Sequence, residues 1–165
     1  MELPHVEPLL DRLAEQLRAL LLERGIDSPA MVGIHTGGAW IAQELHKKLE
    51  LTKPLGTLDI SFYRDDFTER GLNPHVKPSK LLFNVEDEHV ILIDDIIMSG
   101  RTIRAAMNEL FDYGRPASII LASLIDVGGR ELPVEPNCIG THLHMAKHKR
   151  IKLRGPNPLT LEWGK

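Results

Sequence analysis

Apolar positions recur along this chain with two periods, one helical and one extended, and segments of the two kinds follow each other. Three segments have apolar residues every three or four positions, 9–21, 39–49 and 101–113, which predicts three amphipathic helices. Four segments have the pattern of strands: 31–34, 57–63, 89–93 and 118–125. Because most of these strands are continuously apolar, the alternation predicts an α/β fold with a parallel sheet that helices cover on both faces.

Two parts of the chain lie outside this alternation. Residues 64–80 are polar, contain two prolines and a glycine, and show no period, so we expect either a functional lid or a disordered segment. The C-terminal part has a turn or hairpin at 128–136 and short strand-like pieces near 138–144 and 151–153. We therefore expect one domain over residues 1–165, with a small β-rich appendage at its C-terminal end.

Composition narrows the class of protein. The chain has 165 residues, 42% of them hydrophobic and 26% charged, which is typical of a soluble globular domain. The formal net charge of -3 argues against general binding of nucleic acid or anionic membranes. No apolar run reaches the roughly 18 residues of a membrane span. Cys138 is the only cysteine, so we expect a buried apolar residue, no internal disulfide and a cytoplasmic location.

Two adjacent acids mark a candidate ligand site. Asp94 and Asp95 follow the apolar run 90–93 and precede a short turn, 98–102, that leads into a helix. Free N–H groups at a helix N-terminus favour a phosphate, and Gly100 allows the backbone to approach it closely. The acids cannot contact that phosphate favourably, so we expect them to bind sugar hydroxyls or a hydrated Mg²⁺. The stretch therefore predicts a sugar phosphate as ligand.

Three other interpretations of this stretch compete with a sugar-phosphate site. A Walker-type phosphate loop requires the pattern GxxxxGK[ST], which does not occur in the chain. A receiver domain also has paired acids after a strand, but on its first strand and with a partner lysine. The third interpretation is a solvated strand end followed by a capped helix.

The string VILIDDIIMSGRT at 90–102 resembles the motif with which type I phosphoribosyltransferases bind 5-phosphoribosyl-1-pyrophosphate (PRPP). LDISFYRDDF at 58–67, GRPASIILASLID at 114–126 and RELPVEPNCIG at 130–140 are similar, in the same order, to segments of particular members of that family. Those members regulate pyrimidine operons and also have uracil phosphoribosyltransferase activity. The resemblance spans about residues 31–140.

The resemblance implies the type I phosphoribosyltransferase fold, a parallel sheet flanked by helices with a flexible lid loop. It implies that uracil and PRPP give UMP and pyrophosphate with Mg²⁺ as cofactor, through an oxocarbenium-like state. Asp94, Asp95 and Arg64 would be the catalytic residues. Mg²⁺ would be held by oxygens of PRPP and by water near the two acids, without a direct protein cage.

The resemblance also assigns the binding residues. PRPP would contact Asp94, Asp95, Ile96, Ile97, Met98, Ser99, Gly100, Arg101 and Thr102. The pyrophosphate loop would be Thr36, Gly37 and Gly38, the lid would contribute Arg64, Asp65 and Asp66, and uracil would contact Ile125, Asp126, Val127 and Arg130. Three positions depart from the family: Gly37 and Val127 stand where arginine is common, and Gly129 stands where histidine is common.

A regulatory role is the second function that the resemblance implies. The alternative to an enzyme is a nucleotide- or PRPP-sensing regulator of pyrimidine genes with little turnover. We expect weak or absent RNA binding, since Gly129, Glu135 and Thr141 stand where histidine or basic residues are usual. The family implies a homo-oligomer.

Two further groups of residues allow more than one interpretation. The basic run at 147–154 is interpreted as a solvated face or a subunit contact, with a phosphate or RNA patch as alternative. His142, His144 and His148 suggest a metal site, but no acid or cysteine in the sequence completes the set.

Overall fold

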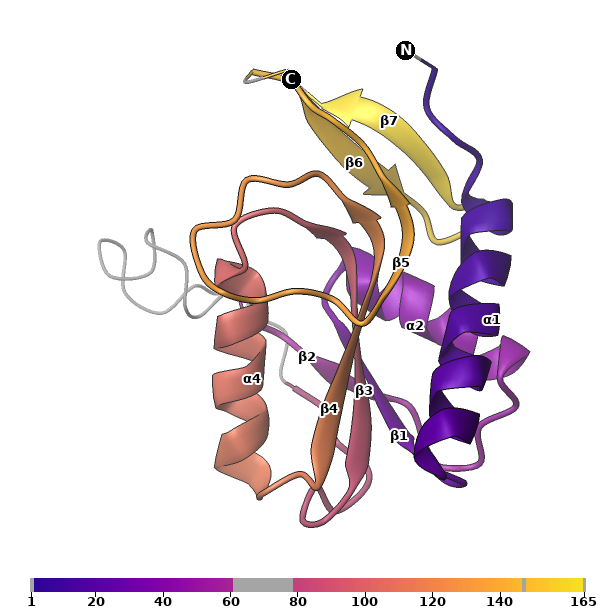
Figure 1. The fold of residues 1–165 in the computed structure, drawn as a ribbon, viewed down its shortest axis with the longest axis vertical. Helices are drawn as coiled ribbons and strands as arrows, with labels where there is room; N and C mark the ends of the chain where they lie inside the picture. Colours follow the sequence, from indigo (N-terminus) through magenta and orange to yellow (C-terminus); the bar gives the residue numbers. More distant parts are fainter. Residues whose placement is uncertain (1, 61–78, 147, 165) are drawn as a thin grey trace.

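The computed structural model describes residues 2–60, 79–146 and 148–164, and shows a sheet between two layers of helices (Figure 1). The helices are α1 (Val6–Arg24), α2 (Gly37–Lys48) and α4 (Arg101–Tyr113). The strands are β1 (Ala30–Ile34), β2 (Gly56–Leu58), β3 (His89–Ile97), β4 (Ser118–Asp126), β5 (Cys138–His142), β6 (Arg150–Arg154) and β7 (Thr160–Gly164). Within these ranges no helix is long and apolar enough to cross a membrane.

The main sheet has the strand order β2-β1-β3-β4-β5, and all of its pairs are parallel. The chain leaves β1 through α2 toward β2 on one side, and β3 continues to β4 and β5 on the other. The strand order therefore reverses between β1 and β3. In open parallel sheets, ligands bind outside the carboxyl ends of the strands at such a point.

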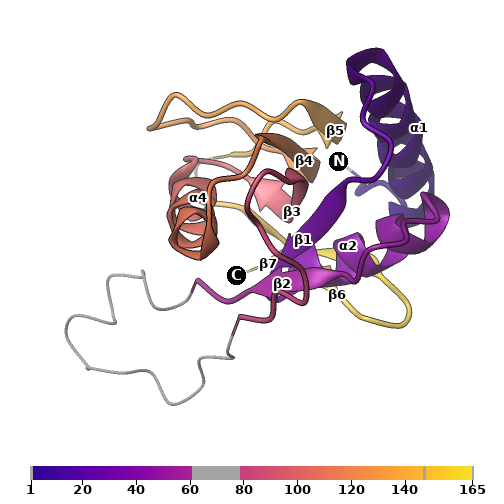
Figure 2. The ribbon, with the colours of Figure 1, turned by 90° about the horizontal axis from the view of Figure 1, so that it is seen from below.

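Successive side chains of β3 point to opposite faces of the sheet, and the core is divided into two clusters, one on each face. Ile91 and Ile93 pack with α1 and α2, while Val90 and Leu92 pack with buried residues of α4 such as Ile103 and Leu110. Figure 2 shows α4 on one side of the sheet and α1 and α2 on the other. Because each face of the central strand is covered, its apolar run is continuous, as the sequence predicts.

The structure confirms the predicted parallel α/β sheet, and each predicted helix is present. Gly25 ends α1 in a left-handed conformation, with φ of 66°, and its N–H donates to the carbonyls of Leu21 and Leu22. The helix α4 has the predicted bounds. The helix α2 begins two residues earlier than predicted, so that Gly37 and Gly38 form its first turn.

Three predictions about strands need correction. The strand β3 does not end before Asp94 but continues to Ile97, because β4 pairs with it through Ile97. The strand β5 belongs to the main sheet, not to an appendage, and it is parallel to β4, so the segment 128–136 is no hairpin. The strand β2 covers only Gly56–Leu58, and residues 61–63 of the predicted strand lie outside the described residues.

The predicted C-terminal appendage is the antiparallel hairpin β6–β7, which lies above the carboxyl ends of the sheet strands (Figure 1). An isolated two-stranded hairpin has little stability in water. This hairpin is attached through Ile151 and Leu153, each only 8% exposed and part of the core next to α1 and α2. Its turn also packs on α2, since a Cβ built on Gly155 would lie 3.0 Å from the Trp40 ring.

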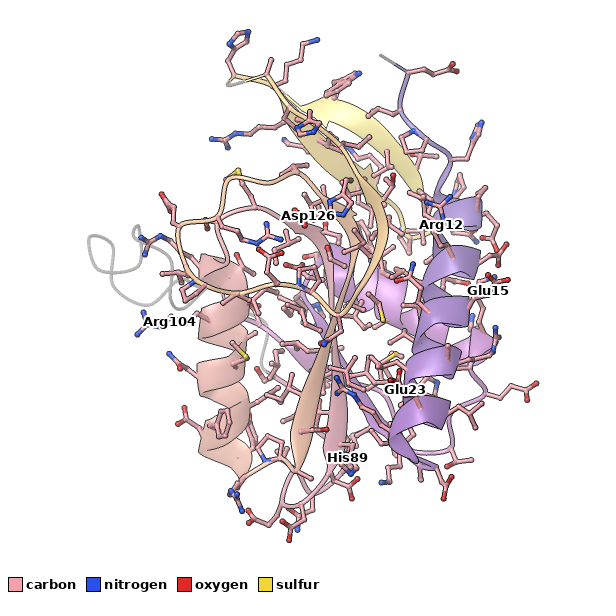
Figure 3. All side chains as sticks on the ribbon, in the orientation of Figure 1. Arg12, Glu15, Glu23, His89, Arg104 and Asp126 are labelled. Carbon is pink, nitrogen blue, oxygen red and sulfur yellow. The ribbon has the colours of Figure 1, made fainter. Side chains whose placement is uncertain are left out.

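The helix α1 covers the open edge of the sheet at β5. Gln16 donates to the carbonyl of Ile139 at 2.8 Å and accepts from its N–H at 3.1 Å, as a neighbouring strand would. Arg12 donates to the carbonyl of Gly140 at 2.7 Å. Figure 3 shows Arg12 on the side of α1 that is turned toward the sheet. The edge strand is thereby paired by side chains instead of by another chain.

Candidate active site

The two predicted acids and the turn after them line one cavity of about 750 Å³. Its walls are formed by residues 94–100, 102–103, 127–129, 145–146 and 149–153. It therefore lies between the end of β3, the segment after β4 and the C-terminal hairpin. Figure 3 shows Asp126 at this end of the sheet, while His89, where β3 begins, lies at the opposite end. The cavity is thus at the carboxyl ends of the strands, where the sequence predicts the ligand.

The acids lie inside β3, just beyond the point where β1 stops pairing with it. The last partner of β1 on β3 is Ile93, opposite Gly33. Asp94 is 5% exposed, and its Oδ1 accepts from the N–H of Asp95 at 2.9 Å. Oδ1 of Asp95 accepts from the N–H of Ile96 at 2.8 Å. These bonds hold both carboxylates close to the backbone, and the missing β1 neighbour leaves them at the cavity wall.

The turn after β3 presents backbone and hydroxyl groups to the cavity. Gly100 has φ of 92°, a conformation that favours glycine, and it is the cap of α4. Ser99, Gly100 and Thr102 line the cavity. Arg101 does not: its Nε donates to Glu131 at 2.9 Å, and its side chain is 64% exposed. The predicted phosphate turn is present, but its arginine is paired with an acid at the surface.

The predicted pyrophosphate loop packs directly against the acids. A Cβ built on Gly37 would lie 2.7 Å from Cγ of Asp95, and one on Gly38 would lie 2.6 Å from the carbonyl oxygen of Ile93. Both distances are too short for a side chain. The first turn of α2 is therefore next to β3 because both positions are glycines, and its N-terminal dipole favours a negative charge there. The carboxylate of Asp95 occupies the space that a side chain at position 37 would need.

The predicted uracil residues are mostly engaged in the fold. Ile125 is fully buried in the core next to α1, and its carbonyl accepts from the hydroxyl of Ser123 at 3.0 Å. The N–H of Val127 donates to Ile97 at 3.1 Å, and the carbonyl of Asp126 accepts from Leu143 at 2.9 Å. Only Val127 of the four predicted residues lines the large cavity, followed by Gly128 and Gly129. Asp126 and Arg130 line a smaller neighbouring pocket of about 200 Å³.

Asp126 and Arg130 form an ion pair with little exposure. The distance between Arg130 Nη2 and Asp126 Oδ2 is 2.7 Å, and the two side chains are 16% and 6% exposed. Burial raises the pKa of Asp126, but hydrogen bonds from Arg130 and Gly128 together with the charge of Arg130 outweigh it and lower the pKa below its usual value. The hydrogen bond to Asp126, together with the charges of Asp126 and Glu135, raises the pKa of Arg130. The pair is therefore charged at neutral pH.

The predicted lid residues Arg64, Asp65 and Asp66 lie outside the described residues. The chain on either side of the segment 61–78 is described. The N–H of Asp59 donates to Oγ of Ser79 at 3.1 Å, and Ser79 donates to Oε1 of Glu109 on α4 at 2.6 Å. Oε2 of Glu109 is buried and has no hydrogen-bond partner among the described residues. Burial raises the pKa of Glu109, helped by the nearby charges of Asp59 and Asp112 and opposed by the hydrogen bond from Ser79.

Part of the basic run 147–154 lies at the cavity, although the sequence favours a solvated face or a subunit contact over a phosphate or RNA patch. Lys149, Arg150 and Lys152 line the cavity on its hairpin side. Lys149 Nζ also lies 5.1 Å from the centre of the Trp163 ring. The signal in the sequence was the basic run 147–154, but its place above the sheet depends on how the hairpin packs.

The residues present fit a Mg²⁺ ion that the substrate holds. Asp94 and Asp95 place carboxylate oxygens, the ligands that Mg²⁺ prefers, at one wall of the cavity. The histidines do not form a metal site in the part of the chain that the structure describes, since no three His, Cys, Asp or Glu residues converge there. His142 instead lies with its Nδ1 3.7 Å from Oδ2 of Asp126.

Comparison with known proteins agrees with this geometry. Residues 2–152 match the family of the phosphoribosyl transferase domain. The bifunctional protein PyrR of Pseudomonas aeruginosa (strain LESB58) is 57% identical over 162 residues, 98% of this chain and 95% of that protein. The bifunctional protein PyrR of Pseudomonas putida (strain W619) is also 57% identical, over 98% and 94%. The solved purine phosphoribosyltransferase of Pyrococcus horikoshii is 25% identical with a TM-score of 0.63, over 84% of this chain and 82% of that one.

Proposed function

The chain belongs to the phosphoribosyltransferase family, in the group of the bifunctional PyrR proteins, and we propose that it converts uracil and PRPP to UMP and pyrophosphate. One observation carries this proposal: the acids of β3 and the turn into α4 line one cavity, and the first turn of α2 packs directly against Asp95 in its wall. That arrangement provides adjacent places for a phosphate, a ribose and a leaving group. We also propose that residues 1–165 act as one domain, because the hairpin packs on the same core.

The 5-phosphate would bind at the turn between β3 and α4. N–H groups at the start of α4 and the hydroxyls of Ser99 and Thr102 are suitable donors. The ribose would then lie over β3, with its hydroxyls on Asp94 and Asp95. Charge that develops on the ribose ring during departure of pyrophosphate is positive, so two fixed carboxylates stabilise it. Neither acid needs to attack the anomeric carbon.

Pyrophosphate would leave toward Thr36, Gly37 and Gly38, where the first N–H groups of α2 are directed at an anion. Mg²⁺, when bound through PRPP, neutralises charge on the leaving group. Asp94 and Asp95 would hold water of its hydration shell or contact it near the ribose. Arg64, Asp65 and Asp66 remain the proposed lid residues, with exclusion of water as their role.

The base would lie between the segment 127–129 and the hairpin, because these two parts form the rest of the cavity wall. Ile125, Asp126, Val127 and Arg130 are the uracil residues that the resemblance implies. Of these, Val127 lines the large cavity, so the direct contacts are proposed for Val127 and for the adjacent Gly128 and Gly129. Uracil as the base is supported by the resemblance to pyrimidine regulators. A purine is the competing base, since the solved relative is named a purine phosphoribosyltransferase.

A regulator with little turnover is the second candidate function. It is favoured by the absence of a positive side chain at Gly37 and by the ion pair that engages Arg101. Binding of UMP or PRPP would then be the signal. Weak RNA binding is also proposed, since Arg130 is 16% exposed and paired with Asp126 and Glu135, so it has little charge to offer an RNA phosphate. A homo-oligomer and a cytoplasmic location complete the proposal.

The test uses the purified full chain with PRPP, Mg²⁺ and one base at a time. UMP formed from uracil, and no nucleotide from hypoxanthine or guanine, is the expected result. UMP binding without turnover would favour the regulator instead. Nucleotide formed from a purine would contradict the assignment of uracil, and neither binding nor turnover would contradict both functions.

A further inference from the structure

Arg130 contacts three separate segments of the chain around the cavity. Its Nη1 and Nη2 donate to the two carboxylate oxygens of Asp126 at 3.0 and 2.7 Å. Nη1 also donates to the carbonyl of Met98 at 2.9 Å, and Nε donates to the carbonyl of Val134 at 2.8 Å. A guanidinium has donors in a planar fork, so one side chain satisfies all of these acceptors at once. All of these acceptors belong to the protein, so these donors of Arg130 hold the fold.

The Met98 end of this network belongs to the phosphate turn. Met98 directly precedes Ser99, and the carbonyl of Ser99 accepts from the N–H groups of Glu131 and Leu132 at 3.0 and 3.1 Å. The loop that contains Arg130 is therefore attached to the turn at two successive residues. Movement of this loop would move the N–H groups that we assign to the 5-phosphate.

The Asp126 end belongs to the base side of the cavity. Oδ1 of Asp126 also accepts from the N–H of Gly128 at 2.9 Å, which fixes the segment 127–129. The N–H of Val127 in turn donates to Ile97, the last residue of β3. The carboxylate of Asp126 thus joins Arg130 to the segment 127–129, which lines the cavity.

We propose that Arg130 and Asp126 are a positioning pair that holds the phosphate turn and the base segment at a fixed separation, so that one ligand fits both. This inference rests on the proposed function. It changes the role of Arg130 from a uracil contact to a residue that acts through Met98 and Asp126. A bidentate pair with little exposure suits this role, because its geometry is specific and few other arrangements satisfy its donors. When two subsites are held at a fixed separation, a ligand that occupies both binds more tightly, because less freedom of motion is lost on binding.

The test compares UMP, which spans both subsites, with ribose 5-phosphate, which occupies only the phosphate and ribose subsites. Dissociation constants are measured for the wild type, Arg130→Met, Arg130→Lys and Asp126→Asn. We expect Arg130→Met to weaken UMP binding about tenfold while ribose 5-phosphate binding changes by less than about threefold. Arg130→Lys is expected to recover little of the lost UMP affinity, because an ammonium lacks the planar fork of donors that binds Asp126 and Met98 at the same time.

A double-mutant cycle and a control complete the test. If the pair acts as a unit, Arg130→Met combined with Asp126→Asn weakens UMP binding no more than the stronger single substitution. Asp126→Asn keeps the shape of the side chain, so it tests the pair even if Arg130→Met does not fold. Lys48→Met removes the ion pairs that the last residue of α2 forms with Glu7 and Asp11 of α1, none of which lines the cavity, and is expected to leave UMP binding unchanged.

Two outcomes would overturn the proposal. An equal loss of affinity for UMP and for ribose 5-phosphate would mean that the pair maintains only the phosphate turn or the fold. Unchanged UMP binding in Arg130→Met would mean that the two segments hold their separation without the pair. A wild type that binds neither PRPP nor UMP would contradict the proposed function itself, which separates that failure from failure of the positioning pair.

Discussion

Gly37 in α2 and Asp95 in β3 are in direct contact across the reversal point of the sheet. A Cβ built on Gly37 would lie 2.7 Å from Cγ of Asp95 and 3.1 Å from its Cβ. The glycine therefore lets one of the two acids lie beside the N-terminus of α2. This contact joins the proposed pyrophosphate loop to the proposed ribose site without an intervening side chain.

The contact predicts that Gly37→Ala destabilises the protein although alanine is the better helix residue. Overpacking of this kind costs about 1–3 kcal/mol of unfolding free energy. Urea denaturation of the variant measures it. The same substitution in an Asp95→Ala background is expected to cost much less, because the carboxylate that obstructs the new methyl group is gone. An equal cost in both backgrounds would show that the contact is not the cause.

Asp95→Asn is expected to lower kcat/KM for UMP formation by about a hundredfold, because it removes negative charge beside the ribose in the transition state. The amide keeps the shape and the hydrogen bond to Ile96, so the thermal unfolding temperature should change little. Steady-state kinetics with PRPP and uracil measure the effect. Asp27→Asn, the same change at an exposed position, is the control. Unchanged kcat/KM in Asp95→Asn would exclude the assigned role of the acid.

Glu109→Gln is expected to stabilise the protein at neutral pH. The folded protein raises the pKa of Glu109, so it binds this proton more tightly than the unfolded chain does. The stabilising contribution is therefore complete below the ordinary glutamate pKa of about 4.3 and is lost as the pH rises through the folded value. Glutamine keeps the acceptor for Ser79 without the charge.

The measurement for Glu109 is the unfolding free energy of wild type and variant at pH 4 and pH 8. We expect the unfolding free energy of the variant, relative to that of the wild type, to be higher at pH 8 than at pH 4. The difference should be less than about 1 kcal/mol, because the side chain is partly exposed to solvent. Glu23→Gln, at an exposed position of α1, should show no such difference. A variant that is less stable than wild type at pH 8 would contradict the prediction.

Cys138 is expected to be unreactive in the native protein. It is 3% exposed, and burial raises its pKa to about 11, so little thiolate exists at pH 8. Ellman's reagent at pH 8 should detect the thiol only slowly in buffer and at once in guanidinium chloride. Rapid labelling of the protein with unchanged circular dichroism would show that the strand β5 opens easily at this position.

The sequence by itself determined the features that depend on neighbouring residues. The period of apolar positions is a local property, so it located the three helices of the described residues and the central strands, and Gly25 marked the end of α1. The acids and the phosphate turn are contiguous in the chain, between Asp94 and Thr102. Their assembly at one cavity could be predicted because no distant segment has to bring them together.

Only the tertiary structure decided which distant segments complete the cavity. The length of β3 depends on pairing with β4, the place of β5 depends on its partners β4 and α1, and Lys149–Lys152 reach the cavity through packing of Ile151 and Leu153. The Gly37–Asp95 contact and the hydrogen bond from Arg130 to Met98 join residues far apart in the chain. Such contacts are set by burial and by hydrogen-bond geometry in three dimensions, and the periodicity of a sequence carries neither.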